Sequence, residues 1–354
     1  MEPLLGKSLT ELQAIAIEAG LPRFVGKQLC EWIYRKRVCS FDEMSNISLK
    51  AREALKEKYC IGRIQPTAEA VSVDGTKKYL FPVSIQQSTI NDQYIECVYL
   101  PEDDRITLCV STQAGCKMGC KFCMTGTLGF HGNLSAADIL AQVLHFPDLT
   151  NLVLMGEGEP MDNIDNVLRA LNVLTSEWGL GWSPKRITVS TVGILESGKS
   201  KVESQKPALQ RFLDETDCHL AISLHNPNAD ERAAIMPAQK LTPISDVLNL
   251  VRQYDWSRQR RLSFEYICWA GINDDIPHAK QLLRLVQGIP CRVNLIRFHE
   301  SADNSNQLFP SSNEQRMIAF RDYLSAHGVT CTIRRSRGED ILAACGMLVN
   351  SLQQ

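Results

Sequence analysis

The sequence predicts an α/β protein built around a partial barrel, preceded by a small helical domain and a short β extension. From residue 106 onward, short runs of β-branched and apolar residues alternate with segments whose apolar residues recur at helical spacing, as in parallel βαβ units. Residues 66–104 instead alternate apolar and polar side chains, as antiparallel strands do. Seven short strands, most of them followed by a helical pattern, suit a partial (βα)6 TIM-like barrel better than a complete one.

The first 65 residues are predicted to form a compact helical accessory domain. Its three helical patterns cover residues 9–20, 24–37 and 47–59. Ser8 or Thr10 could cap the first helix. Residues 1–63 contain 11 Lys or Arg against 8 Asp or Glu, and such an excess permits either phosphate contacts or simply a solvated charged face.

Residues 66–101 are predicted to form the β extension, residues 102–338 the barrel, and residues 339–354 a separate C-terminal segment. The barrel strands are expected at residues 106–112, 151–156, 186–191, 219–224, 262–269, 292–298 and 331–336. The barrel helices are expected at residues 136–146, 164–174, 243–254, 278–286 and 313–324. Ligands of parallel α/β folds bind at the carboxyl ends of the strands, so functional residues are expected there.

Composition restricts the class of protein. No stretch approaches the roughly 18 uninterrupted apolar residues of a transmembrane helix, and the first residues lack the basic and apolar regions of a secretory signal. We therefore expect a cytoplasmic protein without a membrane partner. A disulfide framework is not expected in such a chain, so clustered members of its 13 cysteines should serve metal binding or catalysis.

Three cysteines, Cys116, Cys120 and Cys123, directly follow the first predicted barrel strand. They lie within eight residues in a glycine-containing loop, so their thiolates can converge on one metal centre. Tetrahedral zinc prefers four ligands and no fourth is nearby, although a distant His or Cys could complete a zinc site. An iron–sulfur cube held by three cysteines would leave one iron open to another ligand.

The CxxxCxxC spacing after the first barrel strand resembles the signature of the radical S-adenosylmethionine enzymes. The resemblance implies that Cys116, Cys120 and Cys123 are the metal ligands of one [4Fe–4S] cluster. In that superfamily the open iron binds the amino and carboxylate groups of S-adenosylmethionine. One electron from the cluster then cleaves the sulfonium and releases a 5′-deoxyadenosyl radical.

Further motifs resemble one family of this superfamily, the dual-specificity RNA adenine-C2 methyltransferases, which act on 23S rRNA and tRNA. The resemblance covers most of the chain and rests on the blocks FVGKQLCEWIY, YIECVYLPEDDRITLCVSTQAGC, GEGEP, ITVSTVG, LAISLH, VNLIRF and RSRGEDILAACG. It implies 23S rRNA and tRNA as partners and an electron donor such as flavodoxin or ferredoxin. We expect the protein to be a monomer.

The resemblance also assigns catalytic roles. Adenine C2 lies between two ring nitrogens and is a poor nucleophile, so the family first places a methyl group on a protein sulfur. Cys345 matches this methyl acceptor, and two S-adenosylmethionine molecules are used per turnover. Cys109 matches the cysteine that forms a disulfide with Cys345 and releases the methylated RNA. Glu96 matches the proton acceptor.

Cofactor contacts are implied at the ends of the predicted strands. By resemblance they are Gly158, Glu159, Ser190, Ser223, Leu224, His225 and His299. The family commonly has Asn where this chain has His299. Histidine can also donate or accept a hydrogen bond, so this contact could survive.

The target carbon must reach the barrel mouth, which favours a flipped or unpaired nucleotide. A basic group of the accessory domain, Lys27, Arg35, Lys36 and Arg37, is predicted to contact RNA phosphates, with a purely structural cap as the alternative.

Three other functions remain open from the sequence. The first is the related branch that methylates C8 of 23S rRNA and confers antibiotic resistance. The second is a radical enzyme acting on a peptide or small molecule, which would need no counterpart of Cys345. The third is a non-catalytic RNA-binding protein with a structural zinc.

Overall fold

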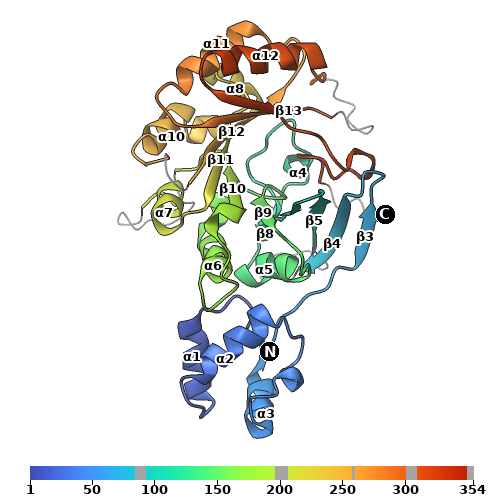
Figure 1. The fold of residues 1–354 in the computed structure, drawn as a ribbon, viewed down its shortest axis with the longest axis vertical. Helices are drawn as coiled ribbons and strands as arrows, with labels where there is room; N and C mark the ends of the chain where they lie inside the picture. Colours follow the sequence, from blue (N-terminus) through green and yellow to red (C-terminus); the bar gives the residue numbers. More distant parts are fainter. Residues whose placement is uncertain (84–92, 196–205, 257–259, 300–308, 349–354) are drawn as a thin grey trace.

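The computed structural model describes residues 1–83, 93–195, 206–256, 260–299 and 309–348. One ten-stranded sheet runs through the molecule, helices cover its outer face, and the N-terminal helices form a layer at one end (Figure 1). Among the described residues, no helix combines the length and apolar character needed to cross a bilayer.

The strand order confirms the predicted parallel barrel and shows how the extension joins it. In spatial order the strands are β14 (Thr330–Ile333), β13 (Arg292–Arg297), β12 (Leu262–Cys268), β11 (His219–Ser223), β10 (Ile187–Thr191), β9 (Asn151–Leu154), β6 (Ile106–Cys109), β5 (Gln93–Pro101), β4 (Lys77–Val83) and β3 (Ala68–Val71). Neighbours from β6 to β14 pair in parallel, whereas β3 to β6 pair antiparallel. The extension therefore continues the barrel sheet.

Two small strand pairs complete the β structure. One joins β1 (Glu2–Pro3) to β2 (Tyr59–Cys60), and the other joins β7 (Gln113–Gly115) to β8 (Phe130–Asn133). The second pair brackets the three-cysteine loop, so the ends of that loop are fixed by backbone hydrogen bonds.

Five long barrel helices lie where they were predicted: α5 (Ala136–Leu144), α6 (Ile164–Thr175), α10 (Ile244–Val251), α11 (Ile276–Leu285) and α12 (Glu314–Ala326). A sixth helix, α7 (Ala208–Glu215), was not predicted. Shorter helices are α4 (Met124–Thr127), α8 (Ala229–Ile235) and α9 (Ala238–Leu241). In α6, for example, Val167, Leu171 and Leu174 recur at helical spacing and are buried, so one apolar face holds the helix to the sheet.

The accessory domain contains the three predicted helices. They are α1 (Leu9–Glu18), α2 (Val25–Cys30), which continues through a π-helical turn (Glu31–Arg35), and α3 (Leu49–Lys58). Ser8, rather than Thr10, caps α1 in a capping box with Glu11.

Two basic residues of this domain, Arg35 and Arg37, make hydrogen bonds to the barrel. Arg35 donates through Nε to the carbonyl of Gly179 at 3.0 Å, and Arg37 donates through Nη1 to the carbonyl of Phe146 at 2.7 Å. Both guanidiniums donate to backbone carbonyls of the barrel domain. These two residues of the basic run therefore hold the accessory domain against the barrel. Lys27 remains exposed.

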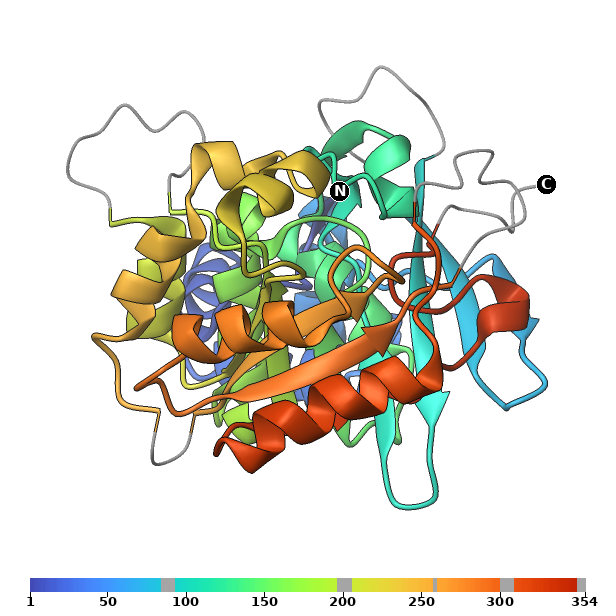
Figure 2. The ribbon, with the colours of Figure 1, turned by 90° about the horizontal axis from the view of Figure 1, so that it is seen from above.

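The C-terminal segment returns to the N-terminal half of the sheet. Residues 337–348 follow β14 and lie beside the hairpin of β3 and β4, as both ribbon views show (Figure 2). Of the predicted segment 339–354, residues 349–354 lie outside the described residues.

Candidate active site

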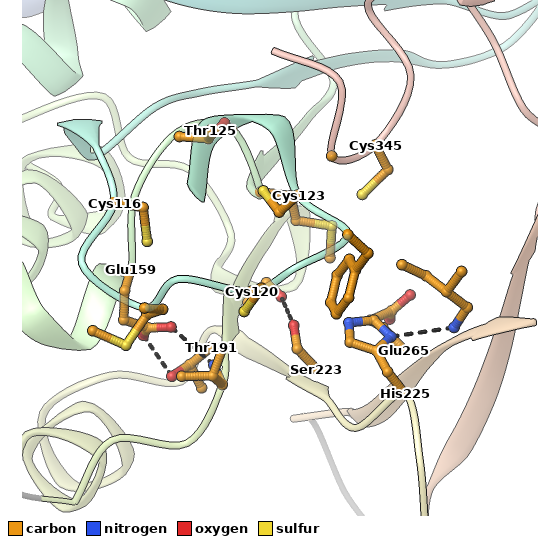
Figure 3. Close-up of a pocket in the computed structure, with 18 of the residues that line it drawn as sticks. Cys116, Cys120, Cys123, Thr125, Glu159, Thr191, Ser223, His225, Glu265 and Cys345 are labelled. Carbon is orange, nitrogen blue, oxygen red and sulfur yellow. Dashed lines mark hydrogen bonds between the residues drawn. The ribbon is translucent and has the colours of Figure 1, made fainter. Parts of the chain in front are cut away.

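A cavity lies at the carboxyl ends of the parallel strands, where functional residues were expected. Its wall is formed by the three-cysteine loop, by the ends of β9 to β13, and by Cys345 of the C-terminal segment. Figure 3 shows Cys345 on the same side of the cavity as Cys123. Residues from the middle and the end of the chain therefore meet in one space.

The three cysteines of the loop all line this cavity. Burial raises the pKa of each thiol, that of Cys116 to about 12, so the thiolates form only with a strong positive charge beside them, such as a metal centre. Among the described residues, no three Cys, His, Asp or Glu side chains gather closely enough to hold a single metal ion. Three thiols spread over a cavity wall fit a multi-atom cluster.

Backbone contacts give the loop its shape. Cys116 N donates to the carbonyl of Gly129 at 2.8 Å, and Lys121 N donates to the carbonyl of Ile235 at 3.0 Å. The loop is thus tied both to β8 and to the turn after β11 and α8. These ties hold Cys116 and Cys120 in place from two directions.

Glu159 of the GEGEP motif lines the cavity, and most hydrogen-bond acceptor positions of its carboxylate are occupied. It accepts hydrogen bonds from Thr191 Oγ1 at 2.6 Å, from Met161 N at 2.9 Å and from Val192 N at 2.9 Å. Burial raises the pKa of Glu159 to about 7, although these three donors oppose the rise. Four acceptor positions on a carboxylate leave one for a ligand.

Gly158 also lines the cavity and has a conformation that favours glycine. Its φ is +97°, and a Cβ there would lie 2.5 Å from the Cβ of Gln113. No side chain fits that space, so only glycine lets the backbone at this position pack against Gln113.

Ser190, Ser223 and His225 line the cavity as predicted. The two serine hydroxyls lie 3.5 Å apart. Burial lowers the pKa of His225 to about 3, so its ring is neutral, and Nδ1 accepts a hydrogen bond from Ile267 N at 3.2 Å. The ring proton is therefore on Nε2, which makes His225 a hydrogen-bond donor.

Two predicted contacts are not brought into the cavity wall. Leu224 does not line the cavity. Its backbone carbonyl accepts a hydrogen bond from Arg232 Nε at 3.1 Å. His299 also lies outside the lining residues. Its Nδ1 lies 3.2 Å from Glu339 Oε2, and its buried Nε2 has no hydrogen-bond partner among the residues that the structure describes.

Cys109 lies next to the C-terminal segment. It packs in a small apolar cluster with Val98 of β5 and with Ala343 and Leu348. Burial raises the pKa of the Cys109 thiol to about 12 and that of Cys345 to about 11, and the Arg334 guanidinium lowers both. The two thiols predicted to form a disulfide thus share one environment.

Glu96 differs from the other predicted residues because it is wholly buried and does not line the cavity. Its carboxylate pairs with the Lys78 ammonium at 3.0 Å, and neither side chain is exposed. Its backbone N donates to Glu157 Oε1 at 2.8 Å. Burial raises the pKa of Glu157 to about 8. A chain of polar contacts therefore joins Glu96 to the GEGEP motif.

The structure adds cavity residues that the sequence did not indicate. Glu265 of β12 is nearly buried and accepts through Oε1 from Ser263 Oγ at 2.9 Å and from Asn294 Nδ2 at 2.8 Å. Arg334, just after β14, lies 3.4 Å from the other oxygen of Glu265. Glu265 lies in the middle of β12 and Arg334 directly follows β14, and nothing in their local sequence marks either residue.

Comparisons with known proteins agree with this architecture. Residues 3–61 match the family model of the ribosomal RNA large subunit methyltransferase N-terminal domain, and residues 110–283 match the radical SAM superfamily. In solved structures, a radical SAM methyltransferase from Sphaerobacter thermophilus is 34% identical, with a TM-score of 0.85 over 98% of this chain and 99% of that one. The radical SAM fold implies a [4Fe–4S] cluster and S-adenosylmethionine.

Curated relatives are similar along their whole length. A probable dual-specificity RNA methyltransferase RlmN from Phocaeicola vulgatus is 53% identical over 99% of this chain and 96% of the relative. The dual-specificity RNA methyltransferase RlmN of Campylobacter hominis is 39% identical over 98% of this chain and 97% of the relative. The chain therefore belongs to the RlmN family of radical SAM RNA methyltransferases.

Proposed function

We propose that this protein methylates C2 of adenosine in 23S rRNA and in tRNA, with Cys345 as the methyl carrier. The observation that carries the proposal is the position of Cys345, which lines the same cavity as Cys116, Cys120 and Cys123. Membership of the RlmN family, whose relatives are named dual-specificity RNA methyltransferases, favours this branch over the C8-methylating one.

Cys116, Cys120 and Cys123 would hold one [4Fe–4S] cluster. When bound, the cluster supplies the electron that cleaves S-adenosylmethionine and so generates a hydrogen-abstracting 5′-deoxyadenosyl radical. Gly158, Glu159, Ser190, Ser223 and His225 would orient the cofactor, since each lines the cavity. Leu224 would contribute through its backbone, and the buried free Nε2 of His299 supports a further polar contact.

Cys345 would act as a nucleophile before it acts as a carrier. Its thiolate attacks the methyl carbon of a first S-adenosylmethionine, the carbon–sulfonium bond breaks, and S-adenosylhomocysteine leaves. Burial raises the pKa of Cys345, and the nearby Arg334 guanidinium favours the thiolate because it opposes that rise. A second S-adenosylmethionine would then be consumed to activate the bound methyl group, which gives two per turnover.

Cys109 would complete the transfer. Its thiolate attacks the sulfur of Cys345, and a disulfide forms as the bond between that sulfur and the methyl-derived carbon breaks. The electron pair of that bond stays with the carbon attached to the base, and this carbon takes up a proton to become the methyl group. A reductant then returns both thiols. The shared packing of Cys109 with Ala343 and Leu348 supports this role.

Glu96 is our proposed acceptor for the C2 proton, a role that rests on the family resemblance. The Lys78 ammonium neutralises its charge at 3.0 Å, and its burial places it behind the cavity wall. Replacement by Gln separates the two possible roles: a proton acceptor is needed for transfer to RNA but not for methylation of Cys345, whereas a structural acid affects protein stability and both steps.

The remaining partners follow from this chemistry. We propose that the accessory domain, residues 1–65, contacts RNA through its exposed face. Lys27 and Lys36 are exposed there. A flavodoxin or ferredoxin would supply electrons to the monomeric enzyme in the cytoplasm, where tRNA and ribosomes are found.

Mass spectrometry of RNA from cells with and without the gene tests this proposal. We expect 2-methyladenosine in 23S rRNA and tRNA to disappear without the gene, and to return with the wild-type gene or with Cys39→Ser, an exposed cysteine of the accessory domain. Cys345→Ala should not restore it. Loss of 8-methyladenosine instead would contradict C2 specificity.

A further inference from the structure

We propose that the hairpin turn between β3 and β4, residues 72–76, is a positioning device for the methyl-carrying cysteine. It holds residues 337–342 of the C-terminal segment and so places Cys345 over the cavity. This inference rests on the proposed function, because it concerns where the methyl carrier stands. It assigns a role in the reaction to a turn that lies outside the barrel and does not line the cavity.

Asp74 provides the first attachment. Its Oδ2 accepts a hydrogen bond from Gly338 N at 3.0 Å and from Arg337 Nε at 3.4 Å, and its carbonyl accepts from Arg337 Nη2 at 2.5 Å. Partial burial works against ionisation, but hydrogen bonds from Thr76, Gly338 and Arg337 outweigh it and hold the pKa of Asp74 well below its usual range. The carboxylate is therefore charged when it holds the segment.

Asp340 provides a second attachment in the opposite direction. Its Oδ1 accepts from Ser72 Oγ at 2.5 Å, and its Oδ2 accepts from Val73 N at 3.1 Å. Lys78, at the start of β4, donates to the carbonyl of Leu342 at 3.4 Å. Thus Asp74 of the turn binds the C-terminal segment, and Asp340 of the segment binds the turn. Lys78 of the same hairpin binds the segment at Leu342, two residues after Asp340.

Close packing fixes the distance between the two segments. Gly338 has a φ of +66°, and a Cβ there would lie 2.8 Å from the Cβ of Ala343 and 2.9 Å from Cγ2 of Thr76. The turn and the segment therefore touch at a point where only glycine fits. Reciprocal hydrogen bonds around such a contact restrict the segment more than a single ion pair does.

The other side of Cys345 is held by the cysteine loop. Met124 N, next to Cys123, donates to the carbonyl of Gly346 at 2.8 Å, and Thr125 Oγ1 donates to the carbonyl of Leu348 at 3.1 Å. Cys345 is therefore suspended between an attachment that ends at Leu342 and one that begins at Gly346. If the hairpin contacts are removed, the segment keeps the second attachment and the packing of Ala343 and Leu348 against Val98 and Cys109.

This geometry matters for Cys345 in particular because its thiol must serve two partners. It must meet the methyl group over the cavity, and it must reach Cys109 within the narrow range of Cα separations that a disulfide allows, about 4.4–6.8 Å. Misplacement by about 1 Å can reduce a rate by roughly a hundredfold. The cluster ligands lie on another loop, so their assembly does not depend on the hairpin.

The test uses the anaerobically reconstituted holoenzyme with Ser72→Ala, Asp340→Asn and the double variant. Asp103→Asn, in the exposed turn between β5 and β6, is the matched control. For each protein we would measure cluster absorbance and EPR, S-methylation of Cys345 by peptide mass spectrometry, and the ratio of methylated RNA to 5′-deoxyadenosine. That ratio reports how well radical formation is coupled to methyl transfer.

We expect unchanged cluster spectra and a coupling ratio about tenfold lower in each single variant, consistent with the loss of a hydrogen bond to a charged group. The double variant should be no worse than Asp340→Asn alone, because the contact that Ser72→Ala removes is one of the two that Asp340 makes with the turn. Ser72→Thr, which keeps the hydroxyl, should restore the ratio, and Asp103→Asn should match wild type.

A wild-type coupling ratio in Ser72→Ala and Asp340→Asn would overturn the inference, and so would additive losses in the double variant. Parallel loss of cluster signal would also overturn it, since the turn would then be a general fold element. If wild-type enzyme methylates RNA without S-methylation at Cys345, the proposed function itself fails, and this result is distinct from the others.

Discussion

The two halves of the sheet position the cavity by different means. In the parallel half, from β9 to β14, Glu159, Ser190, Ser223 and His225 lie at or just after strand ends and line one cavity. In the antiparallel half, from β3 to β6, a fully buried ion pair of Lys78 and Glu96 and a set of polar contacts fasten the C-terminal segment.

The difference shows how one protein combines a general cofactor site with a particular reaction. In our proposal, the three-cysteine loop and the strand ends of the parallel half hold the cluster and its cofactor, since ligands of such barrels bind at strand ends. The proposed methyl carrier, Cys345, comes from a segment whose described residues form no strand, so it depends on charges and hydrogen bonds from the added antiparallel strands. Damage to the two halves should therefore have different consequences.

The largest expected effect is in the antiparallel half. Lys78→Met leaves the Glu96 carboxylate buried without its cation, which costs about 3–5 kcal/mol of unfolding free energy. Chemical denaturation measures this value. Lys77→Met is the control, because Lys77 is more than a third exposed and pairs with Glu69 at 3.1 Å, a kind of contact worth about 0–1 kcal/mol. Equal losses in the two variants would contradict the importance of the buried pair.

A smaller effect is expected in the parallel half from Arg232→Met. The buried guanidinium donates to the carbonyls of Leu224, Ser223 and Val192 at 3.0–3.1 Å, and so joins the ends of β10 and β11. The carbonyl of Leu224 still accepts from Asn226 N at 2.7 Å, so we expect the substitution to cost about 1–3 kcal/mol of unfolding free energy, the value for one buried acceptor left unpaired. The same denaturation measurement applies, with exposed Arg252→Met as control. Because cofactor residues end these strands, we expect S-adenosylmethionine to bind more weakly, whereas Ser72→Ala should leave its binding unchanged.

The smallest effect is a pH dependence far from the cavity. His278 lies 2.9 Å from Glu231 and 2.6 Å from Asp275; burial disfavours its charged form, but the two carboxylates outweigh this and raise its pKa. A raised pKa stabilises the fold fully below the unfolded value of about 6.5, and this contribution is lost as pH rises through the folded pKa. Both carboxylates are more than 40% exposed, so the contribution of charged His278 to the free energy of unfolding should be below about 1 kcal/mol.

Comparison of His278→Gln with wild type in thermal melts at pH 6 and pH 9 measures this contribution. The variant should be less stable at pH 6 and should approach wild type at pH 9. A difference that grows toward pH 9 would show that the sign is wrong.

The sequence predicted the parallel half well because its signals are local. Short apolar strands, amphipathic helices such as α6, and the spacing of Cys116, Cys120 and Cys123 are visible within a few turns of chain. The order of strands and the common location of Ser190, Ser223 and His225 follow from these signals, since parallel strands end at one edge.

The antiparallel half could not be predicted to the same depth because its contacts join distant parts of the chain. Nothing near Asp74 indicates that it binds Gly338, and nothing near Arg35 indicates that its guanidinium docks on Gly179 instead of on phosphate. The alternation of apolar and polar residues predicted the strand that contains Lys78, but not the ion pair that Lys78 forms with Glu96. Such pairings depend on the completed fold, and only the structure reveals them.

The central claim is that Cys345 carries the methyl group to RNA. Holoenzyme incubated with S-adenosylmethionine bearing a deuterated methyl group, and then chased with unlabelled cofactor and RNA in a single turnover, tests it most directly. We predict that the label is found first on Cys345 and then in 2-methyladenosine, with two of its three deuterium atoms in the transferred carbon. Labelled RNA formed by Cys345→Ala, or label that never passes through this cysteine, would contradict the account.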